Sequence, residues 1–206
     1  MAFIDFLKDI LPTHSSELLL SFDEYVDSWG ELIEVGYGSI MADEEAFPSL
    51  GLDENSAVQL SFEAALVLCH DAMRTWRRGR RVRERFFTNL EEAVVMRIGA
   101  TITGDDAAAG EFLNLYKAHA PAFAQLMPHA GNPDDEKEIR ELVMTLRYVV
   151  SRCTGKNDDG NLAGIQRFST HLVEAHKLFK QLDRNSIPDG NTMFSKKPRF
   201  IVRTEL

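Results

Sequence analysis

Apolar residues recur at intervals of three and four along most of this chain, and this spacing is the strongest constraint on its fold. The clearest stripe is formed by Ile139, Leu142, Val143, Leu146, Val149 and Val150. Such a stripe places its side chains on one face of an α-helix. No strand pattern of any length occurs before residue 199. The sequence therefore predicts an all-α fold.

We expect about seven helices, packed as a single-domain helical bundle. Apolar stripes and the caps, glycines and prolines that flank them place the helices along the chain. The expected ranges are 2–11, 17–35, 54–78, 81–98, 105–127, 133–150 and 161–183. After residue 183 the periodicity ends, and Pro188, Gly190 and Pro198 interrupt the chain. The sequence is thus divided into a helical domain, residues 1–183, and an irregular C-terminal arm, residues 184–206.

A basic cluster interrupts this acidic chain. Residues 74–85 carry seven arginines and one acid, a local charge of +6 in a protein of net charge −9. We call the cluster the arginine elbow; it consists of Arg74, Arg77, Arg78, Arg80, Arg81, Arg83 and Arg85. Gly79 is expected to end a helix here, because glycine readily adopts the left-handed conformation that follows many helix C-termini. A second helix would then start near Arg81.

Two kinds of counter-charge can balance the elbow. In the first interpretation the chain's own acids do so, with Asp43–Glu45 as a plausible source. In the second, an external anion does so, either the phosphate backbone of a nucleic acid or an acidic protein surface. Arg81, Arg83 and Arg85 would lie in the first turn of a helix, where each cation costs about 0.3–1 kcal/mol, and a bound anion would relieve that cost.

The functional hypothesis follows from the second interpretation. The net charge of −9 argues against a dedicated DNA-binding domain, which is normally basic. It is compatible with one local docking site. We therefore expect a non-catalytic interaction or regulatory subunit that holds an acidic partner at the arginine elbow, for example a small subunit of a nucleoprotein complex. Its arginines would bind phosphates without reading the base sequence.

Motifs for catalysis are missing from the sequence. There is no glycine-rich phosphate loop, no pair of Cys-x-x-Cys motifs and no Glu-x-x-His. Cys69 and Cys153 lie inside apolar helical patterns and are expected to be buried thiols. The sequence gives no specific reason to name an enzyme, and no cofactor or metal is expected.

The alternative is a helical cofactor-binding protein or enzyme that uses His171 to hold haem or a metal. The run Ala120-Pro-Ala-Phe-Ala-Gln-Leu-Met-Pro128 resembles the globin segment that ends in a haem-contacting phenylalanine, and the resemblance implies His171 as the proximal ligand. Met127 stands where the family has phenylalanine, and only 35 residues follow His171, too few for the family's last two helices. We interpret the likeness as a coincidental similarity in the spacing of residues along packed helices.

A second local likeness surrounds His176. The run Ala175-His-Lys-Leu178 resembles the histidine phosphotransfer motif, which continues with lysine and glycine. Here Phe179 and Lys180 follow instead, so His176 is expected to be an exposed or half-buried helix residue.

Compartment and membrane association can also be addressed from the sequence. The start Met-Ala-Phe-Ile-Asp-Phe lacks the basic region of a secretory signal. No apolar run approaches the roughly 20 residues needed to cross a bilayer. We therefore expect a cytoplasmic protein with no membrane contact.

Overall fold

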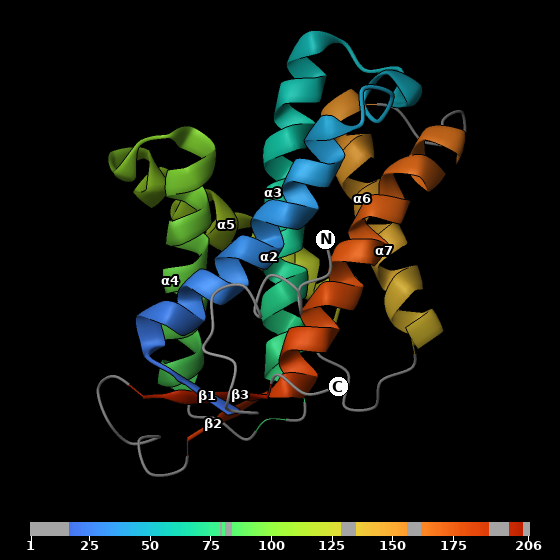
Figure 1. Ribbon diagram of the computed structural model, residues 1–206. Helices are drawn as coiled ribbons and strands as arrows, with labels where there is room; N and C mark the ends of the chain where they lie inside the picture. The colour runs from blue at the N-terminus through green and yellow to red at the C-terminus, as the bar shows by residue number, and fades with distance from the viewer. Residues whose placement is uncertain are drawn as a thin grey trace.

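The computed structural model describes residues 17–78, 80, 84–128, 135–155, 162–189 and 198–203 (Figure 1). These residues contain a short 3-10 helix, η1 (Pro48–Leu50), and six α-helices: α2 (Phe22–Ala42), α3 (Glu54–Arg77), α4 (Glu84–Thr103), α5 (Asp106–Leu126), α6 (Asp135–Thr154) and α7 (Leu162–Asn185). A mostly helical fold is confirmed, but the helix count in the described ranges is six instead of about seven. The additional helix expected over residues 2–11 lies outside the described residues.

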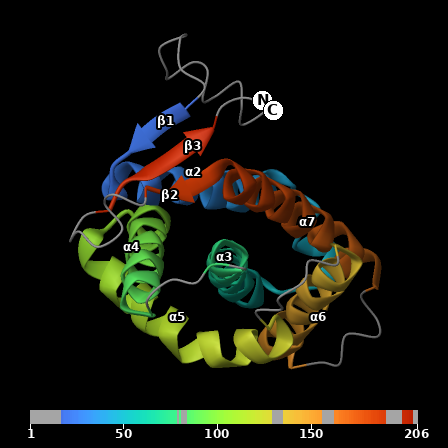
Figure 2. The ribbon, with the colours of Figure 1, turned by 90° about the horizontal axis from the view of Figure 1, so that it is seen from below.

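Helix α3 is the centre of the molecule. Figure 2 shows α3 in the middle, with α2, α4, α5, α6 and α7 arranged around it. Every residue from Glu63 to Trp76 is buried, including the charged Asp71 and Arg74. A helix that is buried on all sides has no face turned to water. Its polar side chains must therefore find partners on the helices that surround it.

The first described helix begins later than the sequence predicted. Ser21 caps α2: its hydroxyl accepts from the Glu24 backbone, and the Glu24 carboxylate accepts from the Ser21 backbone. This reciprocal capping box marks a helix N-terminus. The four residues before it, Glu17–Leu20, form strand β1, so the prediction that they belong to a helix is wrong.

The predicted irregular arm contributes two strands. Strands β2 (Ser186–Pro188) and β3 (Phe200–Arg203) join β1 in an antiparallel sheet of order β1-β3-β2, which lies across the lower end of the helices in Figure 1. Alternate residues of β3 face inward, so that Phe200 and Val202 are buried. The Phe200 ring stacks on Tyr25 of α2 with centroids 3.7 Å apart. The arm is therefore not irregular in these segments, and it completes the core.

Helix α7 approaches η1 very closely at Gly164. A Cβ atom placed on Gly164 would lie 2.5 Å from the carbonyl oxygen of Ser49. Atoms at that distance overlap, so a larger residue would force the two segments apart. Gly164 thus fixes the contact between the start of α7 and η1.

Candidate functional site: the arginine elbow

The arginine elbow lies at the junction of two helices, as the sequence predicted. Helix α3 ends at Arg77, and the backbone N–H of Arg78 donates to the carbonyls of Arg74 and Thr75. Helix α4 is described from Glu84 onward, and the predicted start near Arg81 lies outside the described residues. Arg74 and Arg77 lie in the last turn of α3, where the helix dipole favours cations. The residues between Arg78 and Glu84 are described only at Arg80, so Gly79, Arg81 and Arg83 lie outside the described residues.

Arg74 is the most deeply buried member of the elbow among those that the structure describes. Its side chain is 1% exposed. Its Nε donates to Asp71 Oδ1 over 2.8 Å, and its Nη1 donates to Glu141 Oε2 over 2.9 Å. The bond to Glu141 joins α3 to α6 inside the molecule, whereas the bond to Asp71 lies within α3. Arg74 is therefore inaccessible to an external partner.

Arg78 belongs to the same polar cluster. It pairs with Glu138, whose other oxygen accepts from Lys180 Nζ at 3.1 Å and lies 3.1 Å from His176 Nε2. On the opposite side of the ring, His176 Nδ1 lies 2.8 Å from Asp71 Oδ2. We call this cluster the buried ion network; its members are Asp71, Arg74, Arg78, Glu138, Glu141, His176 and Lys180.

His176 connects three helices through this network. Its two ring nitrogens face carboxylates from α3 and α6, and only the imidazolium form can donate to both at once. Burial alone would raise the pKa of Asp71, but the charges of His176 and Arg74 and their hydrogen bonds hold that pKa well below its usual range. His176 is 3% exposed, so the expectation of an exposed or half-buried histidine is wrong.

Arg80 attaches the end of α7 to the end of α3. It pairs with the Asp183 carboxylate and donates to the carbonyl oxygens of Trp76 and Ser186. Its guanidinium lies over the Trp76 ring, 4.9 Å from the centroid. Burial raises the pKa of Asp183 even with Arg80 beside it. Arg80 thus fixes α7 and strand β2 onto the elbow.

Arg77 and Arg85 form the outer part of the elbow. Arg77 is 33% exposed and pairs with Glu84, itself 70% exposed, over 2.6 Å. The Arg77 guanidinium also lies 4.4 Å from the centroid of the Phe87 ring. Arg85 is exposed, and within the described part of the chain it makes no ion pair. These two arginines flank Glu84 and remain open to solvent.

The acids that pair with the described arginines of the elbow are not the ones expected from the sequence. Arg77, Arg78 and Arg80 pair with Glu84, Glu138 and Asp183, and Arg74 pairs with Asp71 and Glu141. The expectation that Asp43 serves this role is wrong. Asp43 instead accepts from Arg167 Nε at 2.7 Å and lies 2.9 Å from His171 Nε2. These hydrogen bonds hold the pKa of Asp43 well below its usual range.

His171, His119 and the two cysteines lie in separate places. His171 faces Asp43, while His119 lies beside Glu63 and Arg152. Within the described ranges, no group of three His, Cys, Asp or Glu side chains is placed to hold a metal ion. Cys69 and Cys153 are buried free thiols, as predicted. Burial raises the pKa of Cys153 to about 11.

Sequence reasoning missed the acids of the buried ion network. Glu138 and Glu141 stand on α6 among other charged residues, and helical spacing alone assigns them to a solvated face. The available signal was the pair His176 and Lys180, which lie one turn apart and so share a face of α7. These two residues indicate that α7 has a polar face, but they do not indicate which helix that face contacts.

The described helices include none that is long and apolar enough to cross a bilayer. No protein-family model, curated protein or solved structure matches the chain.

Proposed function

We propose that this protein is a non-catalytic helical interaction subunit that docks an acidic partner on the outer part of the arginine elbow. The partner we favour is the phosphate backbone of a nucleic acid, which makes the protein a small subunit of a nucleoprotein assembly. The observation that carries the proposal is the division of the elbow into two parts. Arg74, Arg78 and Arg80 are bound internally, whereas Arg77 and Arg85 face solvent.

The internally bound arginines, Arg78 and Arg80, hold the end of α3, which carries Arg77, against α6 and α7. Arg78 and Arg80 connect the end of α3 to α6 and α7, so these two side chains are held in place. Binding groups that are already fixed lose less conformational freedom when a partner arrives. The exposed Arg77–Glu84 pair is weak, since such pairs contribute about 0–1 kcal/mol. A phosphate can therefore replace Glu84 as the partner of Arg77 at little cost.

The start of α4 adds to this preference for anions. Unpaired backbone N–H groups and the helix dipole both favour negative charge at a helix N-terminus. Glu84 and Arg85 are the first two residues of this 20-residue helix. A phosphate that contacts Arg85 would also lie near these groups. The contacts are to backbone phosphates, so the proposal implies binding without base specificity.

Salt-dependent titration with a short single-stranded RNA tests the proposal. The variant Arg77→Gln/Arg85→Gln removes the two outer cations and leaves the inner arginines intact. If each arginine contacts one phosphate, the slope of log K against log salt should become shallower by about 0.7 for each arginine removed. The matched control, Lys117→Gln/Arg167→Gln, removes two exposed cations from other helices, and the glutamine that replaces Arg167 can still donate to Asp43. It should bind as the wild type does.

Three results would count against the proposal. The first is RNA binding that is absent at low salt, and the second is binding that weakens equally in both variants. The third is stronger, elbow-dependent binding of a polyglutamate peptide, which would replace the nucleic acid by an acidic protein partner.

A further inference from the structure

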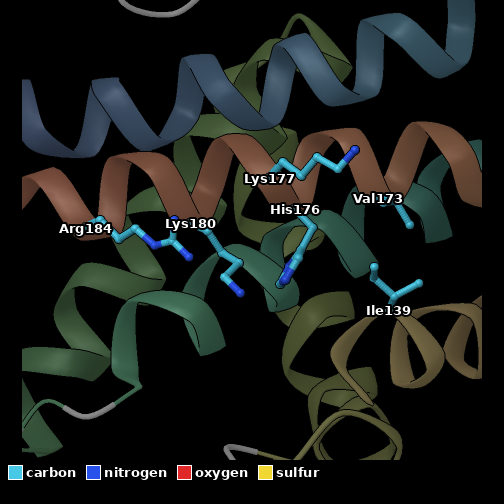
Figure 3. Close-up of a pocket in the computed structure, with 6 residues that line it drawn as sticks. All are labelled: Ile139, Val173, His176, Lys177, Lys180 and Arg184. Carbon is cyan, nitrogen blue, oxygen red and sulfur yellow. The ribbon is translucent and has the colours of Figure 1, made fainter. Parts of the chain in front are cut away.

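We infer that α7 and α6 together form a separate binding pocket for a single phosphate group. The pocket has a volume of about 200 Å³ and is lined by Ile139 of α6 and by Val173, His176, Lys177, Lys180 and Arg184 of α7 (Figure 3). These residues differ from the outer arginines of the elbow. The inference therefore stands independently of the proposed docking function.

Helical spacing brings the cationic side chains to one pocket. Lys177, Lys180 and Arg184 follow one another at intervals of three and four, which places them on adjacent turns of α7. Figure 3 shows His176 and Lys180 extending from α7 toward the side where Ile139 lies. The described residues that line the pocket include no acidic side chain. The lining therefore carries three fixed positive charges in a protein of net charge −9.

The described acids near the lining are shared with other cations. Glu138 accepts from Lys180, and its single negative charge is shared among Lys180, Arg78 and His176. Lys177 pairs with Glu174, and both side chains are more than 60% exposed. Arg184 is exposed and makes no ion pair within the described ranges, although its charge acts on the neighbouring Asp183. Among the described residues, the pocket thus keeps an excess of positive charge that an external anion can meet.

The size and walls of the pocket indicate the class of ligand. Sites for drug-sized molecules measure about 300–1,000 Å³, so a 200 Å³ pocket suits one tetrahedral anion with a short organic group. The Arg184 guanidinium offers paired donors that match phosphate oxygens, and the lysine ammonium groups add point charges. Ile139 and Val173 provide an apolar wall, which lowers the local dielectric constant and strengthens these interactions.

Lys180 and His176 are already oriented for this role. The Lys180 side chain is 13% exposed, and that of His176 is 4% exposed. Their bonds to Glu138 hold both side chains in place, and the lysine ammonium has three donors in all. The buried ion network therefore acts as the support for the pocket. Lys177 and Arg184 supply charge at its exposed rim.

Calorimetric titration at low salt with inorganic phosphate and with glycerol 3-phosphate tests the inference. The wild type should bind each probe in one saturable step, and sodium chloride at equal ionic strength should not compete. The variant Lys177→Gln/Arg184→Gln changes only exposed side chains and should keep the wild-type melting temperature. Its affinity for both probes should fall about tenfold or more, which corresponds to about 1.4 kcal/mol.

Two controls separate this pocket from the elbow. The exposed pair Lys117–Glu92 has the same ammonium to carboxylate distance as Lys177–Glu174, 2.6 Å, but lies on other helices. The variant Lys117→Gln/Arg167→Gln should therefore bind phosphate as the wild type does, and so should Arg77→Gln/Arg85→Gln. Loss of phosphate binding in the elbow variant would overturn the assignment to this pocket.

The titrations also identify the source of the phosphate group. Binding of glycerol 3-phosphate supports a phosphorylated small molecule. If only an oligonucleotide binds, and the Lys177→Gln/Arg184→Gln variant weakens it, the phosphate belongs to a nucleic-acid backbone. If neither probe nor oligonucleotide saturates the protein up to about 10 mM, where the binding free energy is weaker than about 3 kcal/mol, the inference is wrong.

Discussion

Replacing Arg74 by methionine tests whether the inner arginines hold the helices together. Arg74 is 1% exposed and donates to the fully buried Asp71 and to Glu141. Breaking a buried ion pair by removing one partner costs about 3–5 kcal/mol, because the other charge stays buried. In a protein of about 200 residues, that loss lowers the melting temperature by roughly 6–20 °C. Methionine keeps much of the side-chain volume, so a cavity contributes little.

Arg77→Met is the matched control, since it removes the same kind of charge one turn later. Arg77 is one-third exposed and pairs with the exposed Glu84. An exposed pair contributes about 0–1 kcal/mol, and the contact with Phe87 adds about 0.5–1 kcal/mol. Urea denaturation followed by circular dichroism gives both free energies of unfolding, provided that the m-values agree. Equal destabilisation of the two variants, or an unchanged Arg74→Met protein, would refute the argument.

The pH dependence of stability gives a second measure of the same contacts. The folded-state pKa of Asp71 is lowered, so its contribution to stability is present above the ordinary aspartate value of 3.8 and is lost as the pH falls below it. Arg74→Met removes one of the cations that lower this pKa. The wild type should therefore lose more unfolding free energy than the variant between about pH 5 and pH 3. An identical acid dependence in the two proteins would contradict the stated cause of the pKa shift.

Three further predictions concern packing and the thiols. Gly164→Ala should destabilise the protein by about 1–3 kcal/mol, because the added Cβ meets a carbonyl oxygen at 2.5 Å. Gly110→Ala, in a helix with open space around it, should instead stabilise by about 0.5–1 kcal/mol; thermal melts that rank the two in the opposite order would contradict this. Phe200→Ala should cost about 3–5 kcal/mol in urea denaturation, since the ring is fully buried, and a cost below about 1 kcal/mol would mean that the strand is dispensable. Cys69 and Cys153 should resist Ellman's reagent at pH 8 until the protein unfolds, because burial raises the pKa of both thiols; rapid labelling of the native protein would disprove their burial.

The sequence predicted the helices better than their polar contacts. The apolar stripes located α5 and α7 to within two residues at each end and α4 and α6 to within five, and the elbow lies at a helix junction as expected. The pattern did not predict the burial of α3, because an amphipathic stripe implies one face in water and the segment Glu63–Trp76 has none. Asp71 and Arg74 therefore look solvated in sequence although both are fully buried. Which acid meets them depends on how α6 and α7 pack, and periodicity does not contain that information.

Strand β1 failed for a different reason. The run Glu17–Leu20 is too short to distinguish strand from helix by spacing, and its leucines suit either. What makes it a strand is β3, its hydrogen-bonded neighbour far along the chain. A strand that depends on a remote partner carries little local signal.

Because β1 pairs with β3, this sheet can form only after residues 200–203 have been synthesised. Glu17 and Arg203, which lie opposite each other in the sheet, are 186 positions apart in the sequence. Contacts between such distant residues form late, because the cost of closing the loop must be met first. Until Phe200 has been translated, the Tyr25 ring has no stacking partner and one end of the bundle stays open. A nascent chain that stops short of β3 therefore exposes apolar surface, and chaperones bind chains of that kind.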